Sequence, residues 1–391
     1  MRVGIFTDND FGKINGVTTT LKAVLDHVPS DVHVRVYTSA PTAIARHDYL
    51  ALRAPRVALP FYDGMDVHAP RFRAFLAAAR RDRIELVHYT TPGPMGLVAQ
   101  YVAWRLGLPM VGSFHTLLAE YTTLLSGSDR LGRLMREYLR WPYGRCRRVL
   151  VPSRATRDLF VASRIAPDKL QVWSRGVDTT RFHPARRSRA LRDEWGVADG
   201  TPVVLYAGRL SLEKGLAAVP ALWRRAMAST PGARLVFAGE GPLRSELQSA
   251  LPDAVFTGPL PHDRIAETMA SADLFLFPSR TDTLGNVVLE AQASGLPVLV
   301  SDAGGPQENI RDGESGHVCH ATDDAMGFGG RLEALLTDSI RRQAFSHAAR
   351  QYAAHRTWQG SLQPLFKTWR DTVAATGRRT ARMPGPSIRE S

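Results

Sequence analysis

Short apolar runs alternate with longer amphipathic stretches along most of the chain. The runs are rich in Val, Leu and Phe and are bounded by polar residues, as expected of strands buried on both faces of a parallel sheet. The stretches between them have the composition of crossover helices. On this basis strands are predicted at 3–7, 32–38, 86–89, 110–114, 149–151, 170–173, 203–206, 235–238, 255–257, 274–277 and 298–300.

This alternation occurs twice, and the segment 175–200, which combines Gly, Pro and a run of charges, is interpreted as a linker. The predicted fold class is α/β, with two Rossmann-like doubly wound parallel-sheet domains facing a central cleft. We expect the domains at 1–178 and 179–358, a C-terminal helix at 359–375 that crosses back to the first domain, and a disordered tail at 376–391. Ligands of open α/β sheets bind at the carboxyl ends of the strands, so the loops there should carry the chemistry.

Composition limits the class of protein. Hydrophobic residues make up 44% of the 391 residues and charged residues 22%, as in globular proteins. No apolar stretch is long enough to span a bilayer, and the first apolar run meets acidic residues at once, unlike a signal peptide. We therefore expect a cytoplasmic protein. Cys146 and Cys319 lack the spacing of a metal site and are expected to be free, buried thiols.

The net charge of +13 is unevenly distributed. Residues 1–190 hold 29 Lys and Arg against 15 Asp and Glu, whereas residues 191–391 hold 21 against 22. A basic N-terminal half predicts a polyanionic partner for that half: an anionic membrane, a nucleic acid or anionic substrates.

Two basic stretches in this half have an amphipathic pattern. The stretch 69–85 is predicted to be a helix with apolar residues near one face, flanked by Arg71, Arg73, Arg80, Arg81 and Arg83. The stretch 130–148 carries seven arginines interleaved with Leu, Met, Tyr and Trp. Such helices bind membrane surfaces, but a helix packed on the sheet with solvated arginines has the same pattern.

The segment 279–297, SRTDTLGNVVLEAQASGLP, lies between two predicted strands and contains the most informative motif. Helix-forming residues from Asn286 to Ala293 place Gly285 at a helix N-terminus, where backbone N–H groups bind phosphate. Asp282 precedes this helix and Glu290 lies two turns into it, so one carboxylate could bind sugar hydroxyls and the other a ribose. Alternatively, Asp282 caps the helix and Glu290 is solvated.

This segment resembles the acid-x7-acid motif of the retaining glycosyltransferases of family 4, which have the GT-B fold. Asp282 replaces the usual Glu and Leu284 the usual Phe, while Gly285, Glu290, Ala291, Ala293 and Gly295 match the motif. The form TDTLGNVVLEA is most similar to the branch that contains GDP-mannose-dependent mannosyltransferases and sulfoquinovosyl-type glycolipid synthases.

The resemblance implies further donor-binding residues. The KINGV segment with Asn15, Gly16 and Val17 follows the first strand and resembles the glycine loop that approaches the donor phosphates. The segment YAGRLSLEKG supplies Arg209 and Lys214, which clamp the diphosphate in the family. The remaining donor-binding positions are Gly241, Gly258, Leu260, Leu284 and Asn286.

His115 follows the strand at 110–114, where the family places a histidine near the transferred sugar and the acceptor. With Asp282, Arg209 and Lys214 it completes the expected catalytic set. Alone, each of these side chains could equally be structural or a solvated surface group.

Competing motifs do not find support in the sequence. Asp8-Asn9-Asp10 has the DxD form of a metal site, but no further carboxylate cluster accompanies it, so no metal is expected. The dinucleotide GxGxxG, the P-loop, the zinc motif HExxH and the serine elbow GxSxG are not found. No cofactor is predicted.

The resemblance implies retaining, metal-independent transfer of a hexosyl unit by front-face attack, with GDP-mannose as donor and a membrane lipid or glycolipid as acceptor. The protein would then sit peripherally at the inner face of the plasma membrane. Alternatives are a UDP-sugar-dependent glycolipid synthase, transfer to a small soluble acceptor, and a sugar-nucleotide epimerase of the same fold. A non-catalytic polyanion-binding protein is the rival from another class; no nucleic acid partner is expected.

Overall fold

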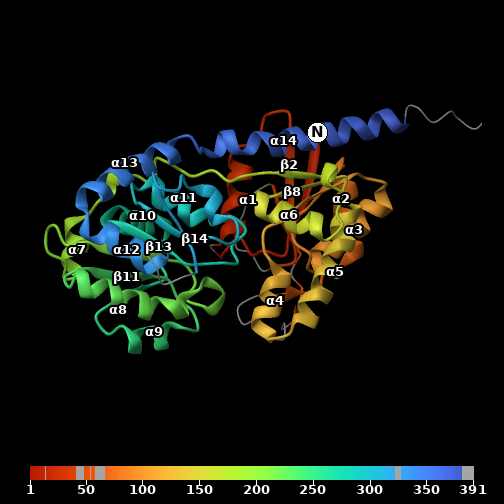
Figure 1. Ribbon diagram of the computed structural model, residues 1–391. Helices are drawn as coiled ribbons and strands as arrows, with labels where there is room; N and C mark the ends of the chain where they lie inside the picture. The colour runs from red at the N-terminus through yellow and green to blue at the C-terminus, as the bar shows by residue number, and fades with distance from the viewer. Residues whose placement is uncertain (14, 41–47, 53, 58–66, 322–326, 381–391) are drawn as a thin grey trace, which may run out of the picture. The chain divides into compact units, whose positions relative to one another are not determined.

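The computed structural model describes residues 1–13, 15–40, 48–52, 54–57, 67–321 and 327–380 (Figure 1). The chain divides into two compact units. The first unit consists of Met1–Pro152, Arg157–Trp173 and the chain from Leu362, and the second of Ser153–Thr156 and Ser174–Ser361. Each unit is built on one parallel sheet with its own buried core.

The main sheet of the first unit has, among the described residues, the strand order β3-β2-β1-β6-β7-β8-β9, and all neighbours run parallel. The order reverses between β1 and β6, and such a switch point is where open α/β sheets bind ligands. The strands are β1 (Arg2–Phe6), β2 (His33–Thr38), β3 (Tyr49–Ala51), β6 (Leu86–Tyr89), β7 (Met110–Ser113), β8 (Arg148–Val151) and β9 (Leu170–Val172), with a separate antiparallel pair β4 (Arg56–Val57) and β5 (Val67–His68).

Helices fill the connections of the first sheet. They are α1 (Gly16–Asp26), α2 (Phe72–Arg81), α3 (Pro94–Leu106), α4 (Leu118–Ser126), α5 (Asp129–Arg145) and α6 (Arg154–Ala162). In helix α3, particular residues set the first and last positions of the helix. Pro94 stands at its first turn, where its missing N–H costs nothing, and Gly107 ends it with a φ of 64°.

The sheet of the second unit has the order β12-β11-β10-β13-β14-β15, again with parallel neighbours. Its switch point lies between β10 and β13. The strands are β10 (Val203–Ala207), β11 (Arg234–Ala238), β12 (Val255–Gly258), β13 (Leu274–Phe277), β14 (Val298–Ser301) and β15 (Gly316–Cys319). The helices are α7 (Arg189–Glu194), α8 (Val219–Ser229), α9 (Arg244–Ala250), α10 (His262–Ser271), α11 (Asn286–Ala293), α12 (Phe328–Thr337) and α13 (Ser339–Ala354).

The last helix, α14 (Trp358–Thr380), belongs from Leu362 onward to the first unit. Its Trp369 is fully buried and stacks edge-on against His88 of β6, with 5.4 Å between ring centroids. Arg370 pairs with Asp31 at 2.7 Å. The end of the chain therefore completes the core of the unit in which the chain begins.

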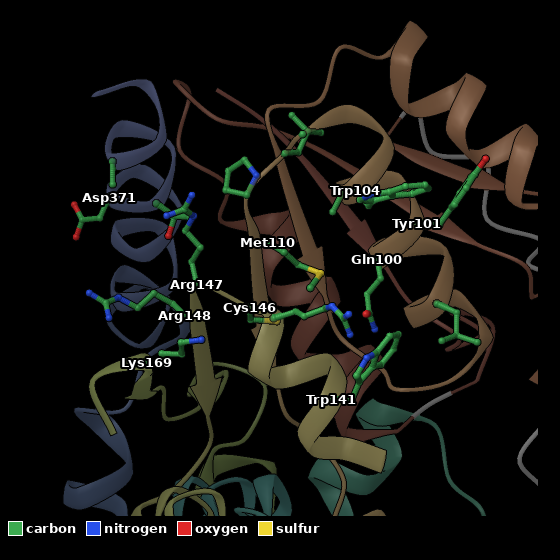
Figure 2. A pocket seen from close by; sticks show the side chains of 18 of the residues that line it. Gln100, Tyr101, Trp104, Met110, Trp141, Cys146, Arg147, Arg148, Lys169 and Asp371 are labelled. Atoms are coloured by element: carbon green, nitrogen blue, oxygen red, sulfur yellow. The ribbon is translucent and has the colours of Figure 1, made fainter. Parts of the chain in front are cut away.

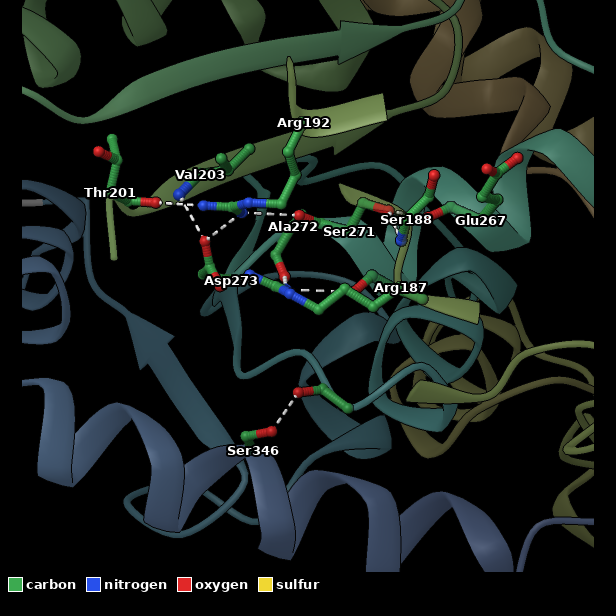
Figure 3. A network of polar contacts seen from close by, with 12 residues as sticks. Arg187, Ser188, Arg192, Thr201, Val203, Glu267, Ser271, Ala272, Asp273 and Ser346 are labelled. Carbon is green, nitrogen blue, oxygen red and sulfur yellow. Dashed lines mark hydrogen bonds and ion pairs between the residues drawn. The ribbon is translucent and has the colours of Figure 1, made fainter. Parts of the chain in front are cut away.

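The interpretation of 175–200 as a linker is wrong. Leu191 and Trp195 are buried in the core of the second unit. Arg192, only 6% exposed, donates to Asp273 at 3.0 Å and to the carbonyl of Thr201 at 2.7 Å (Figure 3). Arg187 donates to the same carboxylate at 2.8 Å. The charge run is thus tied to the second sheet by a partly buried ionic network, which composition alone could not reveal.

The two doubly wound parallel sheets are confirmed. Every predicted strand is present, with bounds within one residue, whereas the short edge strands β3 and β15 were missed. Cys146 and Cys319 are free and buried, as predicted. In the described part of the chain, no helix is long and apolar enough to cross a membrane. The tail predicted at 376–391 is helical up to Thr380, and its remainder lies outside the described residues.

Candidate donor site and neighbouring polar residues

The loops that follow β10, β11, β12, β13 and β14 lie at the carboxyl edge of the second sheet. The predicted residues Arg209, Lys214, Gly241 and Asp282 are on these loops, and Gly258 is the last residue of β12. Since the strands are adjacent and parallel, their loops meet at one edge, around the switch point between β10 and β13.

Lys214 and Asp282 are in direct contact. The Nζ atom of Lys214 donates to both carboxylate oxygens of Asp282, at 2.9 and 2.8 Å. The side chains are 16% and 20% exposed, so the pair is partly shielded from water yet still reachable by a ligand. Asp282 therefore does not cap α11, because its carboxylate is directed to a cation on the neighbouring loop.

The loop that carries Asp282 is fixed from two sides. On one side, the hydroxyl of Thr281 donates to the carbonyl of Glu213 at 2.8 Å, next to Lys214. On the other, the N–H of Gly305 donates to the carbonyl of Asp282 at 2.9 Å. A Cβ on Gly305 would lie 1.9 Å from the carbonyl oxygen of Thr283, so only glycine allows this approach. The loop is preorganised by backbone contacts.

Arg209, Gly241 and Gly258 line the next loops along the sheet. The carbonyl of Arg209 accepts from the buried Tyr206 at 2.8 Å, which fixes the backbone where the side chain leaves the sheet. A Cβ on Gly241 would lie 2.3 Å from the carbonyl of Leu210, so these loops are in close backbone contact. Gly258 has a φ of 73° at the end of β12, two residues before the half-buried Leu260.

Gly285 begins α11 in the left-handed conformation, with a φ of 73°, which confirms the predicted helix N-terminus. Leu284 beside it is buried, and its carbonyl accepts from the amide of Asn309 at 2.7 Å. Asn286, the first helical residue, is half-buried. The short helix thus presents an N-terminus beside Asp282, as an anion site requires.

Glu290 lies on the second turn of α11. Desolvation raises the pKa of this carboxyl to about 7, while the nearby Arg181 acts in the opposite direction. Part of its side chain remains exposed, so a ligand can still reach it. A carboxyl with this pKa changes its charge near neutral pH, unlike an ordinary glutamate.

We predict that this titration governs nucleotide affinity. An ionised Glu290 accepts hydrogen bonds from a ribose diol, so affinity should rise as the pH increases from about 6 to about 8, while Glu290→Gln should bind weakly and without this rise. The stability of the free protein should change in the opposite direction to the affinity. It falls as the pH rises through about 7, because the carboxyl of Glu290 loses its proton at a lower pH in the unfolded chain than in the folded one. Calorimetric titration of GDP across this range checks it; an unchanged pH dependence in Glu290→Gln would exclude the role.

The first unit contains the other predicted site residues. Asn15 caps α1: its side-chain oxygen accepts from the N–H groups of Val17 and Thr18, each at 2.9 Å. Asn15 and Gly16 are exposed, and they follow β1 at the switch point of the first sheet. The cap uses only the side-chain oxygen of Asn15, so a phosphate here could accept from backbone N–H groups and from the Asn15 amide nitrogen.

Asp8 of the DxD sequence also acts as a helix cap. Its carboxylate accepts from the N–H of Met95 at 2.9 Å and from the hydroxyl of Thr91 at 2.5 Å. Burial raises its pKa to about 6. Asp10 instead accepts from the N–H of Gly12 at 2.9 Å. The two carboxylates thus serve different local structures, and the described residues include no cluster of three or more metal-ligating side chains.

His115 lies just beyond β7 and is half-buried. Its Nε2 is 2.8 Å from the hydroxyl of Ser113, which is 2.9 Å from Nε2 of the fully buried His88. One hydroxyl between two imidazoles can donate to only one of them, so the tautomers of His88 and His115 are coupled. Trp173 packs edge-on against His115, with centroids 6.2 Å apart.

The predicted membrane arginines surround α2, whose bounds are narrower than the predicted 69–85. Arg71, Arg73, Arg80, Arg81 and Arg83 are all exposed. The apolar face of the helix, however, is buried in the core of the first unit. Helix α2 therefore presents mainly charge, with Ala77 and part of Phe72 as its apolar surface, which corresponds to the alternative of a packed helix with solvated arginines.

Sequence reasoning missed the residues that hold this machinery in place: Glu213, Thr281, Gly304, Gly305, His88 and Ser113. Thr281, Gly304 and Gly305 lie in segments between predicted strands that are rich in Gly, Ser and Thr, whereas His88 and Ser113 lie within β6 and β7 and carried no such signal. Only the strand order could show which loops contact one another.

Comparison with known proteins covers both units. Residues 14–181 match the family described as Glycosyltransferase Family 4, and residues 188–352 match Glycosyl transferases group 1. A GDP-mannose-dependent alpha-mannosyltransferase of Corynebacterium glutamicum is 30% identical over 99% of this chain and 93% of its own length. Sulfoquinovosyl transferase SQD2 of Arabidopsis thaliana is 32% identical over 78% of this chain and 60% of its own length. An alpha-monoglucosyldiacylglycerol synthase of Streptococcus pneumoniae is 27% identical over 86% and 78%.

Among solved structures, Anabaena Alr3699/HepE in complex with UDP and glucose matches with a TM-score of 0.76 and 19% identity, over 95% of this chain and all of that one. At this identity the likeness concerns the fold.

Proposed function

Because the chain belongs to the glycosyl transferases group 1 family, with the GT-B fold that its motifs predicted, it is a glycosyltransferase that uses a sugar nucleotide, and we propose that it transfers mannose from GDP-mannose to a membrane lipid or glycolipid. The transfer would retain the anomeric configuration and need no metal. The observation that carries the proposal is the contact of Lys214 with Asp282 beside the N-terminus of α11.

The proposed donor pose follows from the chemistry of these groups. Lys214 and Arg209 would bind the diphosphate, and Asp282 would accept hydrogen bonds from the sugar hydroxyls. Glu290, further along α11, would bind the ribose. The name of the Corynebacterium relative supports GDP-mannose.

The proposed reaction takes place on one face of the sugar. The bond from the anomeric carbon to the phosphate oxygen breaks, and the acceptor oxygen bonds to the same face. The acceptor proton passes to an oxygen of the departing nucleoside diphosphate. Negative charge grows on this leaving group, and the cations of Lys214 and Arg209 together with the helix N-terminus would stabilise it. These groups can fill the role that a metal ion has in other transferases.

On the acceptor side, His115 would donate to a sugar hydroxyl or orient the acceptor. A lipid acceptor is supported by the Streptococcus relative, whose name specifies a diacylglycerol product, and by the basic charge of residues 1–190. The same charge supports peripheral binding to an anionic membrane, in which Arg80, Arg81 and Arg83 would contribute long-range attraction.

Donor choice is testable with the purified protein, since a ligand that binds the native state raises the unfolding midpoint. GDP-mannose should stabilise the protein more than UDP-glucose, UDP-galactose or ADP-glucose at equal concentration, and the shift should persist in EDTA. Preference for a UDP-sugar would assign the UDP-dependent alternative. Loss of the shift in EDTA, with recovery in Mg²⁺, would contradict the metal-independent site. Conversion of the donor to an isomer without any acceptor would identify an epimerase.

A further inference from the structure

A large open groove lies on the first unit, away from the predicted chemistry (Figure 2). Its volume is about 1380 Å³, and it is bordered by α3, the end of α5, the segment before β9 and helix α14. Met110 and Arg148, which line it, are the first residues of β7 and β8. His115 follows the opposite end of β7, so the groove is at the amino edge of the sheet and forms no part of the candidate site.

One side of the groove is aromatic. Trp104 is 74% exposed and Trp141 48% exposed, unusual values for such large apolar side chains. Tyr101 and Gln100 accompany Trp104 in Figure 2. The amide nitrogen and oxygen of Gln100 are inaccessible to solvent and, within the described residues, have no hydrogen-bond partner. The Gln100 amide therefore lies beneath the groove surface and offers no contact to a ligand in the groove.

The other side of the groove is charged, and its cations outnumber the carboxylates of Asp168 and Asp371, which also line it. Figure 2 shows Arg147, Arg148 and Lys169 on the side of α14. Arg145 stacks over Trp141, with its guanidinium carbon 4.2 Å from the ring centroid, and so joins the two sides. Over the ranges that the structure describes, neither Arg145, Arg147 nor Arg148 forms an ion pair with a carboxylate. Arg145 and Arg147 are exposed and available to an anion, whereas Arg148 donates to the carbonyl of Asp168.

Helix α5 extends this surface. Leu131, Leu134, Tyr138 and Trp141 form a row at helical spacing and are 39%, 66%, 39% and 48% exposed. The row ends at Trp141 in the groove. Exposed leucines next to tryptophan, tyrosine and arginine are typical of helices that lie in a membrane interface, where the rings occupy the level of the lipid head groups. A nucleic acid would match the charge but leave the leucines in water.

We propose that the α5 row and the groove form a lipid-docking surface that holds one anionic phospholipid of the bilayer. The phosphate would bind Arg145 and Arg147, and the acyl chain would run along Trp104 and Trp141. This proposal deepens the lipid-directed part of the proposed function. The bound lipid is an anchor, not an acceptor, because it lies at the sheet edge opposite His115.

The test compares two sets of exposed side chains in the full-length protein. Trp104→Ser/Trp141→Ser removes the aromatic wall. Arg80→Ser/Arg81→Ser/Arg83→Ser removes charge from α2, where no large apolar side chain is exposed. We expect the tryptophan variant to lose about tenfold or more of its binding to phosphatidylglycerol vesicles at moderate salt, since the apolar contribution to interfacial binding is lost. The arginine variant should lose binding only at low salt. Both should keep the unfolding midpoint and the affinity for GDP.

Vesicles with brominated acyl chains locate the contact. Quenching of tryptophan fluorescence in the wild type should largely disappear in the Trp104→Ser/Trp141→Ser variant, whose remaining five tryptophans serve as the internal control. Equal vesicle binding by this variant, or undiminished quenching, would overturn the proposal. Self-association would also overturn the proposal. If the molecular mass of the wild type rose with protein concentration in the absence of lipid, and the Trp104→Ser/Trp141→Ser variant stayed monomeric, a second copy of the chain would occupy this surface.

The outcome is separable from that of the proposed function. Lys214→Ala should bind vesicles like the wild type. If this variant and the wild type bind through Trp104 and Trp141 while the wild type transfers no sugar, only the proposed function fails. If the wild type transfers sugar to lipid but its vesicle binding does not depend on Trp104 and Trp141, only the docking surface is refuted.

Discussion

Lys214→Ala is expected to lower the rate of transfer by about 10²–10³-fold, the effect of removing one preorganised group that stabilises charge in a transition state. The proposed leaving group gains negative charge as it departs, and Lys214 is held at its loop by both oxygens of Asp282. The fold should persist, since the pair lies at the sheet edge and not in the hydrophobic core. Initial rates with saturating donor measure the loss.

Matched variants separate charge from geometry. Lys214→Arg keeps the charge and should recover part of the activity, whereas Asp282→Asn keeps the shape of the acid and should weaken binding of the sugar nucleotide more than that of free GDP. If Lys214→Ala transferred sugar at the wild-type rate, the phosphate clamp would be wrongly assigned. If Asp282→Asn weakened both ligands equally, its contact with the sugar would be refuted.

Gly305→Ala is expected to weaken donor binding by about 100-fold or more, although Gly305 touches no predicted ligand. The added methyl would lie 1.9 Å from the carbonyl oxygen of Thr283 and 2.8 Å from the Cα of Leu284. These are backbone atoms that cannot rotate away, so the loop carrying Asp282 must shift, and misplacement by about 1 Å is costly at a preorganised site. Titration with GDP-mannose measures the loss.

The control is Gly232→Ala in the same unit, where the new methyl meets no atom within 4 Å. It should leave donor affinity unchanged. Wild-type affinity in Gly305→Ala would show that the loop adapts, and the preorganisation inferred from its backbone contacts would be wrong.

The inner strands of both sheets were the most predictable because they are buried on both faces. Leu274–Phe277 is a continuous apolar run and Val203–Ala207 is fully buried. Such runs identify a strand without any information on the neighbouring strands. The edge strand Tyr49–Ala51 is only half-buried and its pattern is correspondingly weak. The segment 175–200 was misinterpreted because the arginines at 187 and 192 are anchored by Asp273, some 80 residues later.

The acidic motif was predictable for a different reason: its residues are local, so their spacing along one loop and helix fixes their geometry. The supports of that motif come from other strands. Gly305 follows β14 and Glu213 follows β10, and nothing in their local sequence states that both contact the loop after β13. Pairings of this kind depend on strand order, which sequence spacing does not encode.

The sequences of helices α2 and α5 likewise do not reveal which surfaces contact other parts of the protein. Both are basic and amphipathic in sequence. The apolar face of α2 packs against its own sheet, whereas α5 leaves Leu134 and Trp141 exposed. Amphipathicity predicts that a face is covered but cannot say whether protein or lipid covers it.

The central claim is best tested by the anomeric configuration of the product. GDP-α-mannose labelled at carbon 1 would be supplied in EDTA with vesicles of phosphatidylglycerol and a bacterial glycolipid extract, and the lipid product examined by NMR. We expect a mannosyl lipid in which the one-bond coupling at carbon 1 is that of an α-linkage. A β-linked product, or intact GDP-mannose after incubation with active enzyme and all acceptors, would contradict it.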